Sequence, residues 1–270
     1  MPNLTVDGAR IHYLDEGFGD VIVLLHGIGA SSEDWEAQVD ALRAQYRVIA
    51  PDLRGFGKSE RAGNYRIERF AADVWALLAE LKIDRFSLVG HSMGGAIALE
   101  MAIAKPACIE RILLANTLPS FQIDTWKKRL LFVTRLGLMA VFGPGVLARR
   151  VADRLFPGPE HEALRRQQVE RGAGNSRWVY LQTISGLIGW TAASRLSKLV
   201  MPALVLMSEH DYFPIEDGER FAGALPNSRF VLAEGMHHSL QQEAPALFND
   251  IVLSFMHQPL AANLEFRRNA

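Results

Sequence analysis

Short apolar runs and longer amphipathic stretches alternate along the first 115 residues of the chain. Apolar runs of strand length lie at residues 9–14, 21–25, 47–50, 86–89 and 112–115. Helical spacing of apolar positions marks residues 31–46, 67–81 and 93–104. The run at 9–14 alternates weakly and predicts an edge strand, whereas the later runs are continuous. Continuous apolar strands between helices predict a mostly parallel sheet that is covered on both sides.

This alternation stops after Leu118. Residues 120–198 contain several helical stretches, separated by Gly- and Pro-rich breaks, and no convincing strand pattern. Strand-like runs return at 203–207 and 229–232, each followed by a helical stretch. We therefore expect one α/β core, formed by residues 1–119 and 199–270, that carries a helical insertion over residues 120–198.

Charge is distributed unevenly between these two parts. The chain has a formal net charge of −1, but residues 120–198 hold 13 Lys and Arg against 5 Asp and Glu. The chain as a whole has no basic excess, which argues against nucleic-acid binding. The basic insertion could attract an anionic partner, such as an acyl carrier protein, an acidic substrate or a lipid head group. A solvated helical surface would show the same excess.

Several further features limit the class of protein. The single cysteine, Cys108, cannot form an internal disulfide. The N-terminus lacks a signal-peptide pattern, and no apolar run is long enough to span a membrane, so a cytoplasmic location is expected. No Cys and His cluster has metal-ligand spacing, so neither a metal nor a cofactor is expected.

A lone serine lies between a predicted strand and a predicted helix. Gly90-His91-Ser92-Met93-Gly94 matches Gly-x-Ser-x-Gly in the strand-to-helix context which that motif requires. Glycines two positions on either side allow a sharp turn, and the helix N-terminus offers free N–H groups to developing negative charge. These features predict that Ser92 is a nucleophile. The alternative is a glycine-rich turn in which Ser92 is an ordinary helix cap.

At these residues the sequence resembles the alpha/beta-hydrolase family over nearly its whole length. The resemblance rests on five stretches, HGIG (26–29), PDLRGFGKS (51–59), GHSMGG (90–95), SEHDYFP (208–214) and EGMHHSLQQEAP (234–245). It implies the alpha/beta-hydrolase fold, with a helical cap inserted after the sixth strand. It also implies a catalytic triad in the chain order serine, acid, histidine.

The resemblance implies Asp211 as the acid and a histidine of the His237-His238 pair as the base. An acid five positions on and a proline seven positions on favour His238, because Glu243 and Pro245 lie there. His237 stands where the family usually has glycine and remains the alternative. An acid after an earlier strand, as in some members, has no counterpart here, because Asn116-Thr117 offers no carboxylate.

The family also implies the remaining parts of the site and its chemistry. The backbone N–H groups of Ile28 and Met93 would form the oxyanion hole, with His26 structural. A serine nucleophile argues against dehalogenases and epoxide hydrolases, which carry aspartate. The expected activity is hydrolysis of a small carboxylic ester through an acyl-enzyme. Lactones, thioesters, carrier esters and carbon–carbon bonds beside a ketone suit the same residues. A ligand receptor or signalling module with slow turnover is an alternative of another class.

The cap would form a wall of the substrate pocket. Aromatic and long apolar side chains there could line a mostly apolar pocket for an acyl chain or a ring, although most would only form the packing of the cap itself. The candidates for substrate contact are Phe121, Trp126, Met139, Phe142 and Trp190 of the cap, together with Phe213 of the core.

Overall fold

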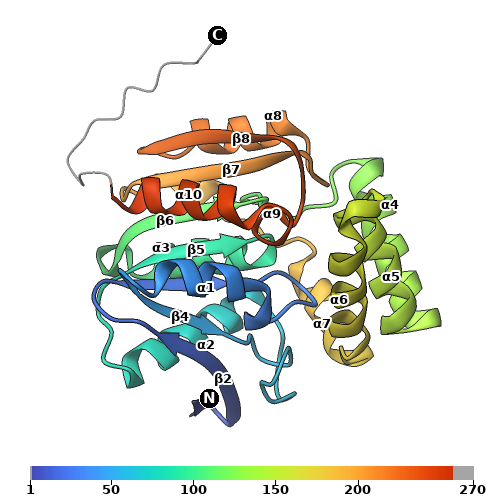
Figure 1. Cartoon of the computed structure of the whole chain (residues 1–270), viewed down its shortest axis with the longest axis horizontal. Helices are drawn as coiled ribbons and strands as arrows, with labels where there is room; N and C mark the ends of the chain where they lie inside the picture. Colours follow the sequence, from blue (N-terminus) through green and yellow to red (C-terminus); the bar gives the residue numbers. More distant parts are fainter. Residues whose placement is uncertain (1, 258–270) are drawn as a thin grey trace.

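A computed structural model describes residues 2–257 of the 270, with the side chain of Lys127 left out. Its centre is an eight-stranded sheet with the strand order β1-β2-β4-β3-β5-β6-β7-β8 (Figure 1). Strands β3 to β8 run parallel, whereas β1 and β2 pair antiparallel at one edge. The strands are β1 (Asn3–Val6), β2 (Ala9–Glu16), β3 (Val21–Leu25), β4 (Arg47–Pro51), β5 (Phe86–His91), β6 (Ile109–Ala115), β7 (Ala203–His210) and β8 (Ser228–His237).

Helices cover both faces of this sheet, as the apolar runs predicted. One face packs against α1 (Glu36–Leu42) and α10 (Pro245–Met256). The other packs against α2 (Ile67–Glu80), α3 (Met93–Ala104) and α8 (Ile215–Gly223). The side chains of β3 alternate between the two faces. Val23 and Leu25 belong to the core on the side of α2, α3 and α8, whereas Ile22 and Leu24 belong to the core on the side of α1 and α10. The mostly parallel sheet covered on both faces, which the sequence predicted, is confirmed.

Two predicted elements differ in detail from the structure. The sheet edge is the short strand β1, so the run at 9–14 forms the second strand, β2. The predicted helix over 31–46 is divided into a 3₁₀ turn, η1 (Ser32–Trp35), and α1. The side chain of Ser31 accepts a hydrogen bond from the Glu33 N–H and begins this segment as its N-cap. The division follows from the non-helical backbone of Trp35.

The helical cap follows β6 and precedes β7. It comprises α4 (Trp126–Gly137), a π-helical turn η3 (Leu138–Phe142), α5 (Pro144–Leu155), η4 (Pro159–His161), α6 (Glu162–Ala173), α7 (Arg177–Leu187) and η5 (Ala193–Lys198). The segments that enter and leave the cap pair with each other through an isolated bridge between Ser120 and Thr191. Beside that bridge, the Phe121 N–H donates to the Trp190 carbonyl over 2.9 Å.

The cap lies at one end of the sheet (Figure 1) and is fixed to the core by polar contacts. Arg171 of α6 forms ion pairs with Asp34 at 3.1 Å and with Glu33 at 3.4 Å. The side-chain amide of Asn175 donates to the Gly29 carbonyl over 2.8 Å. These contacts place the cap over the loops that follow the carboxyl ends of the strands. No helix within residues 2–257 is long and apolar enough to cross a membrane.

Two short elements remain. The turn η2 (Pro106–Cys108) connects α3 to β6, and the single helical turn α9 (Leu240–Glu243) follows β8.

Candidate active site

Ser92 occupies a strained turn between β5 and α3. Its backbone has φ +54° and ψ −120°, outside the regions that non-glycine residues favour. A Cβ atom on Gly94 would lie 2.0 Å from the Leu25 carbonyl oxygen, and one on Gly90 would lie 2.6 Å from the Gly94 oxygen. Only glycine fits at both positions, so the chain can turn sharply and leave Ser92 partly exposed at the carboxyl end of β5.

Asp211 and His238 lie next to each other at the carboxyl end of the sheet. Asp211 follows β7 and His238 follows β8, so parallel strands deliver both to the end that carries Ser92. The Nδ1 atom of His238 lies 3.0 Å from each carboxylate oxygen of Asp211. The Asp211 side chain is fully buried and its loop is fixed, because one of its oxygens accepts the Phe213 N–H. The carboxylate can therefore orient the ring of His238.

The neighbouring histidine has a separate partner. His237 donates from Nδ1 to Glu243 at 2.7 Å, and its backbone N–H donates to the same carboxylate at 2.6 Å. Its ring contacts His210 at 5.1 Å between centroids. Each histidine therefore contacts a different acid, and His238 is the one that contacts Asp211.

Two side chains fix the backbone of His238. His91 donates from Nε2 to the His238 carbonyl over 2.7 Å, and the Asn116 amide donates to the same oxygen over 2.7 Å. Burial, and then the neighbouring His238, lower the pKa of His91 to about 3, so its ring stays neutral. Sequence reasoning did not identify Asn116 as a site residue. Its only signal was a polar residue directly after the buried strand β6.

The predicted oxyanion donors lie next to the serine. A Cβ atom on Gly27 would contact the Ser92 Cβ at 3.3 Å, so the loop that carries Ile28 borders Ser92. Among the described residues, neither the Ile28 N–H nor the Met93 N–H donates a hydrogen bond. Met93 also begins α3, where the helix dipole favours negative charge. Both groups are available to an incoming oxygen.

His26 fixes this loop through both of its ring nitrogens. Nδ1 donates to the Gly27 carbonyl at 2.8 Å, and Nε2 accepts the Leu53 N–H at 2.9 Å. Burial lowers the pKa of His26. An acceptor role at Nε2 requires the neutral ring, so His26 holds the loop and has no free nitrogen for proton transfer.

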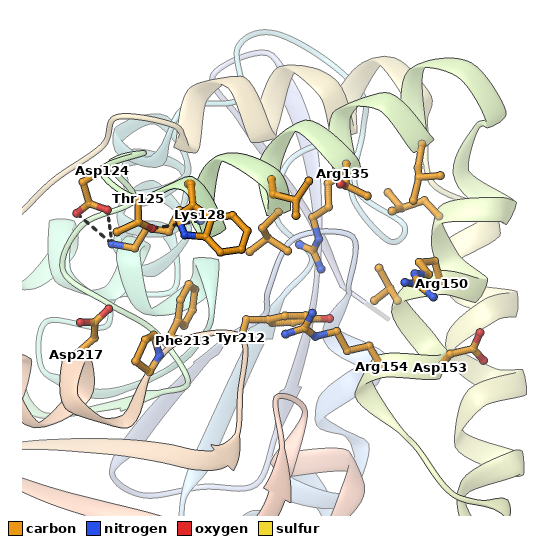
Figure 2. A pocket seen from close by; sticks show the side chains of 18 of the residues that line it. Asp124, Thr125, Lys128, Arg135, Arg150, Asp153, Arg154, Tyr212, Phe213 and Asp217 are labelled. Atoms are coloured by element: carbon orange, nitrogen blue, oxygen red, sulfur yellow. Dashed lines mark hydrogen bonds and ion pairs between the residues drawn. The ribbon is translucent and has the colours of Figure 1, made fainter.

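A cavity of about 1030 Å³ lies between the cap and the loop after β7 (Figure 2). Its walls come mainly from α4 and α5 of the cap and from residues 212–214 and α8 of the core. Tyr212 connects this cavity to the candidate base, because its ring meets the His238 ring edge-on with centroids 4.6 Å apart. A smaller cavity of about 30 Å³ borders Ile28 and Gly29. Arg135 lines both.

The six predicted contact residues occupy different places. Trp126 and Phe213 line the large cavity, and Met139 lines the small one. Phe121 is buried against the rings of Trp190 and Phe213. Trp190 donates from its indole N–H to Glu100 at 2.8 Å. Phe142 is 63% exposed and lines neither cavity.

The site contains the groups that acyl transfer needs, namely a hydroxyl in a strained turn, an imidazole oriented by a carboxylate and two free N–H donors. Within residues 2–257, no three His, Cys, Asp or Glu side chains are grouped so that they could hold a metal ion.

Comparison with known proteins identifies similar chains. A family model described as the alpha/beta hydrolase fold matches residues 20–245. A putative carbamate hydrolase, RutD of Agrobacterium fabrum, is 27% identical over 255 residues, which cover 92% of this chain and 97% of that protein.

Two solved structures have the same architecture. The enol-lactonase of Burkholderia xenovorans LB400 superimposes with a TM-score of 0.87 at 27% identity, covering 95% of this chain and all of that one. A thermophilic esterase of Thermogutta terrifontis, in a malate-bound form, gives a TM-score of 0.83 at 25% identity, covering 94% and 96% of the two chains.

Proposed function

The chain belongs to the alpha/beta hydrolase fold family, and on that premise we propose that it is a serine hydrolase of carboxylic esters. The observation that carries this proposal is the 3.0 Å contact between His238 Nδ1 and the buried Asp211 carboxylate, at the strand ends that hold Ser92. In this assignment Ser92 is the nucleophile, His238 the general base and Asp211 the group that orients it. Residues 120–198 form the cap that closes over them.

The mechanism follows from these roles. His238 Nε2 takes the hydroxyl proton of Ser92 as its oxygen attacks the carbonyl carbon, and the carbonyl oxygen becomes an oxyanion. The N–H groups of Ile28 and Met93 stabilise that charge, each contributing about 2.7–4 kcal/mol to the transition state. His238 then gives its proton to the leaving group, which departs from an acyl-enzyme. A water molecule, deprotonated by the same ring, releases the acid.

The comparisons favour particular carbonyl substrates within this chemistry. Similarity to an enol-lactonase and to an esterase supports oxygen esters, with lactones included. A carbamate is the second candidate, because a putative carbamate hydrolase aligns over 92% of the chain. Thioesters, carrier esters and carbon–carbon bonds use the same attacking group, but no described contact favours them.

Steady-state hydrolysis of 4-nitrophenyl esters of increasing acyl length tests the proposal, with wild type and Ser92→Ala measured in parallel. We expect sustained turnover that disappears in Ser92→Ala. The preferred acyl length would indicate how long an acyl group the cavity accepts. Hydrolysis of a matched 4-nitrophenyl carbamate, measured in the same way, compares carbamates with esters as substrates. A single stoichiometric release followed by slow turnover would instead indicate a receptor. Activity that survives in Ser92→Ala would disprove the assignment of the nucleophile.

A further inference from the structure

Two arginines of the cap converge on one tyrosine beside the proposed base. The guanidinium carbon of Arg154 lies 4.4 Å from the centre of the Tyr212 ring, and that of Arg135 lies 5.2 Å from it. Figure 2 shows both side chains extending from their helices toward Tyr212. Contact with a ring face attracts a cation, but it does not neutralise the charge.

Neither arginine has an acidic partner. Within the part of the chain that the structure describes, no carboxylate oxygen lies within 4.0 Å of the guanidinium nitrogens of Arg135 or Arg154. Of the other basic side chains that line the cavity, Lys128 binds Asp124 and Arg220 binds Asp217, whereas Arg150 forms no ion pair within the described residues. The Asp153 carboxylate also lines the cavity and forms no ion pair within residues 2–257. The lining therefore has five cationic and three acidic side chains, and its positive charge is in excess.

This arrangement places two like charges at one ring. Arg135 is only partly exposed to water, and both guanidinium groups lie close to the Tyr212 ring. An oxyanion within reach of both guanidinium groups would offset this charge and accept charge-assisted hydrogen bonds from two planar donors. We propose that the substrate of this hydrolase carries a carboxylate, which Arg135 and Arg154 bind beside Tyr212.

The position of this site relates the carboxylate to the scissile bond. Tyr212 directly follows Asp211 and touches the His238 ring, so the anion site adjoins the proposed triad. Arg135 also lines the small cavity beside Ile28, on the side of the predicted oxyanion hole. The carboxylate would thus lie on the part of the substrate that extends from the reacting carbonyl into the large cavity. Monoesters of dicarboxylic acids, and lactones that bear a carboxylate, have this form.

The geometry favours a small acidic substrate over an acidic protein bound to the outside of the cap. Arg154 and Arg135 point into the cavity, and their partner ring belongs to the core. Arg149 and Arg154 lie on the same helix and are both exposed, but only Arg154 lines the cavity. A surface-docked protein would depend on Arg149 at least as much as on the two cavity-lining arginines. Arg149 is therefore a matched control.

The first test compares two esters of equal length that differ in charge. The substrates are 4-nitrophenyl hydrogen glutarate and its primary amide, with the adipate pair as a longer set. We expect the acid to have the larger kcat/KM, and Arg135→Gln or Arg154→Gln to reduce the acid-to-amide ratio about 10- to 100-fold, as loss of a charged hydrogen bond does. Arg149→Gln should leave the ratio unchanged. An equal loss in Arg149→Gln would overturn the proposal in favour of surface docking.

The second test measures binding without turnover, because this proposal rests on the proposed function. Calorimetry on Ser92→Ala would compare glutaramate with the uncharged glutaramide, with and without Arg135→Gln. Charge-dependent binding without Ser92-dependent hydrolysis would refute the proposed activity and keep the carboxylate site. Hydrolysis without charge preference, together with equal binding of the two probes, would refute the carboxylate site alone. Tighter binding of a phosphomonoester than of glutaramate would also overturn it.

Discussion

The side-chain amide of Asn116 donates a hydrogen bond of 2.7 Å to the backbone carbonyl of His238. The same side chain accepts the Ser208 N–H at 2.7 Å and donates to the Ser208 hydroxyl at 2.9 Å. Asn116 is completely buried and adopts a positive φ of 47°. It therefore joins the ends of β6 and β7 to the loop that carries the proposed base.

Asn116→Ala should lower kcat while changing KM little. The His238 backbone would lose one of its two donors, and misplacement of a general base by a fraction of an ångström costs rate rather than binding. We expect a loss of about tenfold, equivalent to about 1.4 kcal/mol of activation free energy. Steady-state kinetics would measure it. Thr117→Val is the control, because the Thr117 hydroxyl is buried without a partner. Equal losses in both variants would contradict a positioning role for Asn116.

Asp211→Asn should reduce kcat far more than Glu243→Gln does. The two acids hold adjacent histidines at similar distances, 3.0 Å and 2.7 Å, but only Asp211 contacts His238. Replacing the acid of a serine triad by its amide costs about 10⁴-fold in kcat, because the wrong tautomer is favoured. Glu243→Gln should retain most of the activity. The reverse order of losses would assign the base to His237.

Gly94→Ala should destabilise the fold, whereas Gly137→Ala should stabilise it. The added methyl group at position 94 would meet the Leu25 carbonyl oxygen at 2.0 Å, so the strand or the helix must move. We expect a loss of about 3 kcal/mol in the free energy of unfolding. Gly137 ends α4 with open space around the Cβ position, and alanine there should add about 0.5–1 kcal/mol. Urea titration of both variants would measure these changes.

Asp34 should make the stability of the protein depend on pH. Burial raises the pKa of Asp34 to about 6, although the Arg171 guanidinium opposes the shift. The folded state then binds a proton more tightly than the unfolded chain. Stability is highest below the unfolded pKa and falls as the pH rises from about 4 to about 6.

Asp34→Asn removes this titration. Relative to wild type, the variant should gain stability across the same pH window, by an amount on the order of 3 kcal/mol. Urea denaturation of the two proteins at both ends of the window would measure the difference. A difference that stays constant with pH would show that folding does not change the pKa of Asp34.

Local sequence patterns predicted those parts of the fold that depend on local chemistry. The helix predicted at 93–104 has the same bounds as α3, because all of its residues except Glu100 are small or apolar and the Gly-x-Ser-x-Gly turn fixes its start. The strand predicted at 21–25 has the same bounds as β3, because all five of its residues are apolar. The strand β1 was missed because four residues with two polar side chains, NLTV, carry little strand signal.

The cavity could not be predicted in the same way. Arg135 and Tyr212 are 77 positions apart, and their contact depends on how the cap is oriented over the core. Phe142 illustrates the same limit. It ends a π-helical turn, whose wider period shifts the direction of its side chain from the one that an α-helix would give, and it lies 63% exposed.

The bridge between Ser120 and Thr191 makes the segment between them a structural unit that can be exchanged. Because the chain leaves and rejoins the core at one paired point, helices can be lengthened, shortened or replaced between these residues without shifting β6 against β7. The proposed triad lies wholly outside residues 121–190, whereas most of the residues that line the large cavity lie within them. Grafting residues 121–190 of a relative between the same two positions would transfer its specificity and leave the hydrolytic apparatus in place.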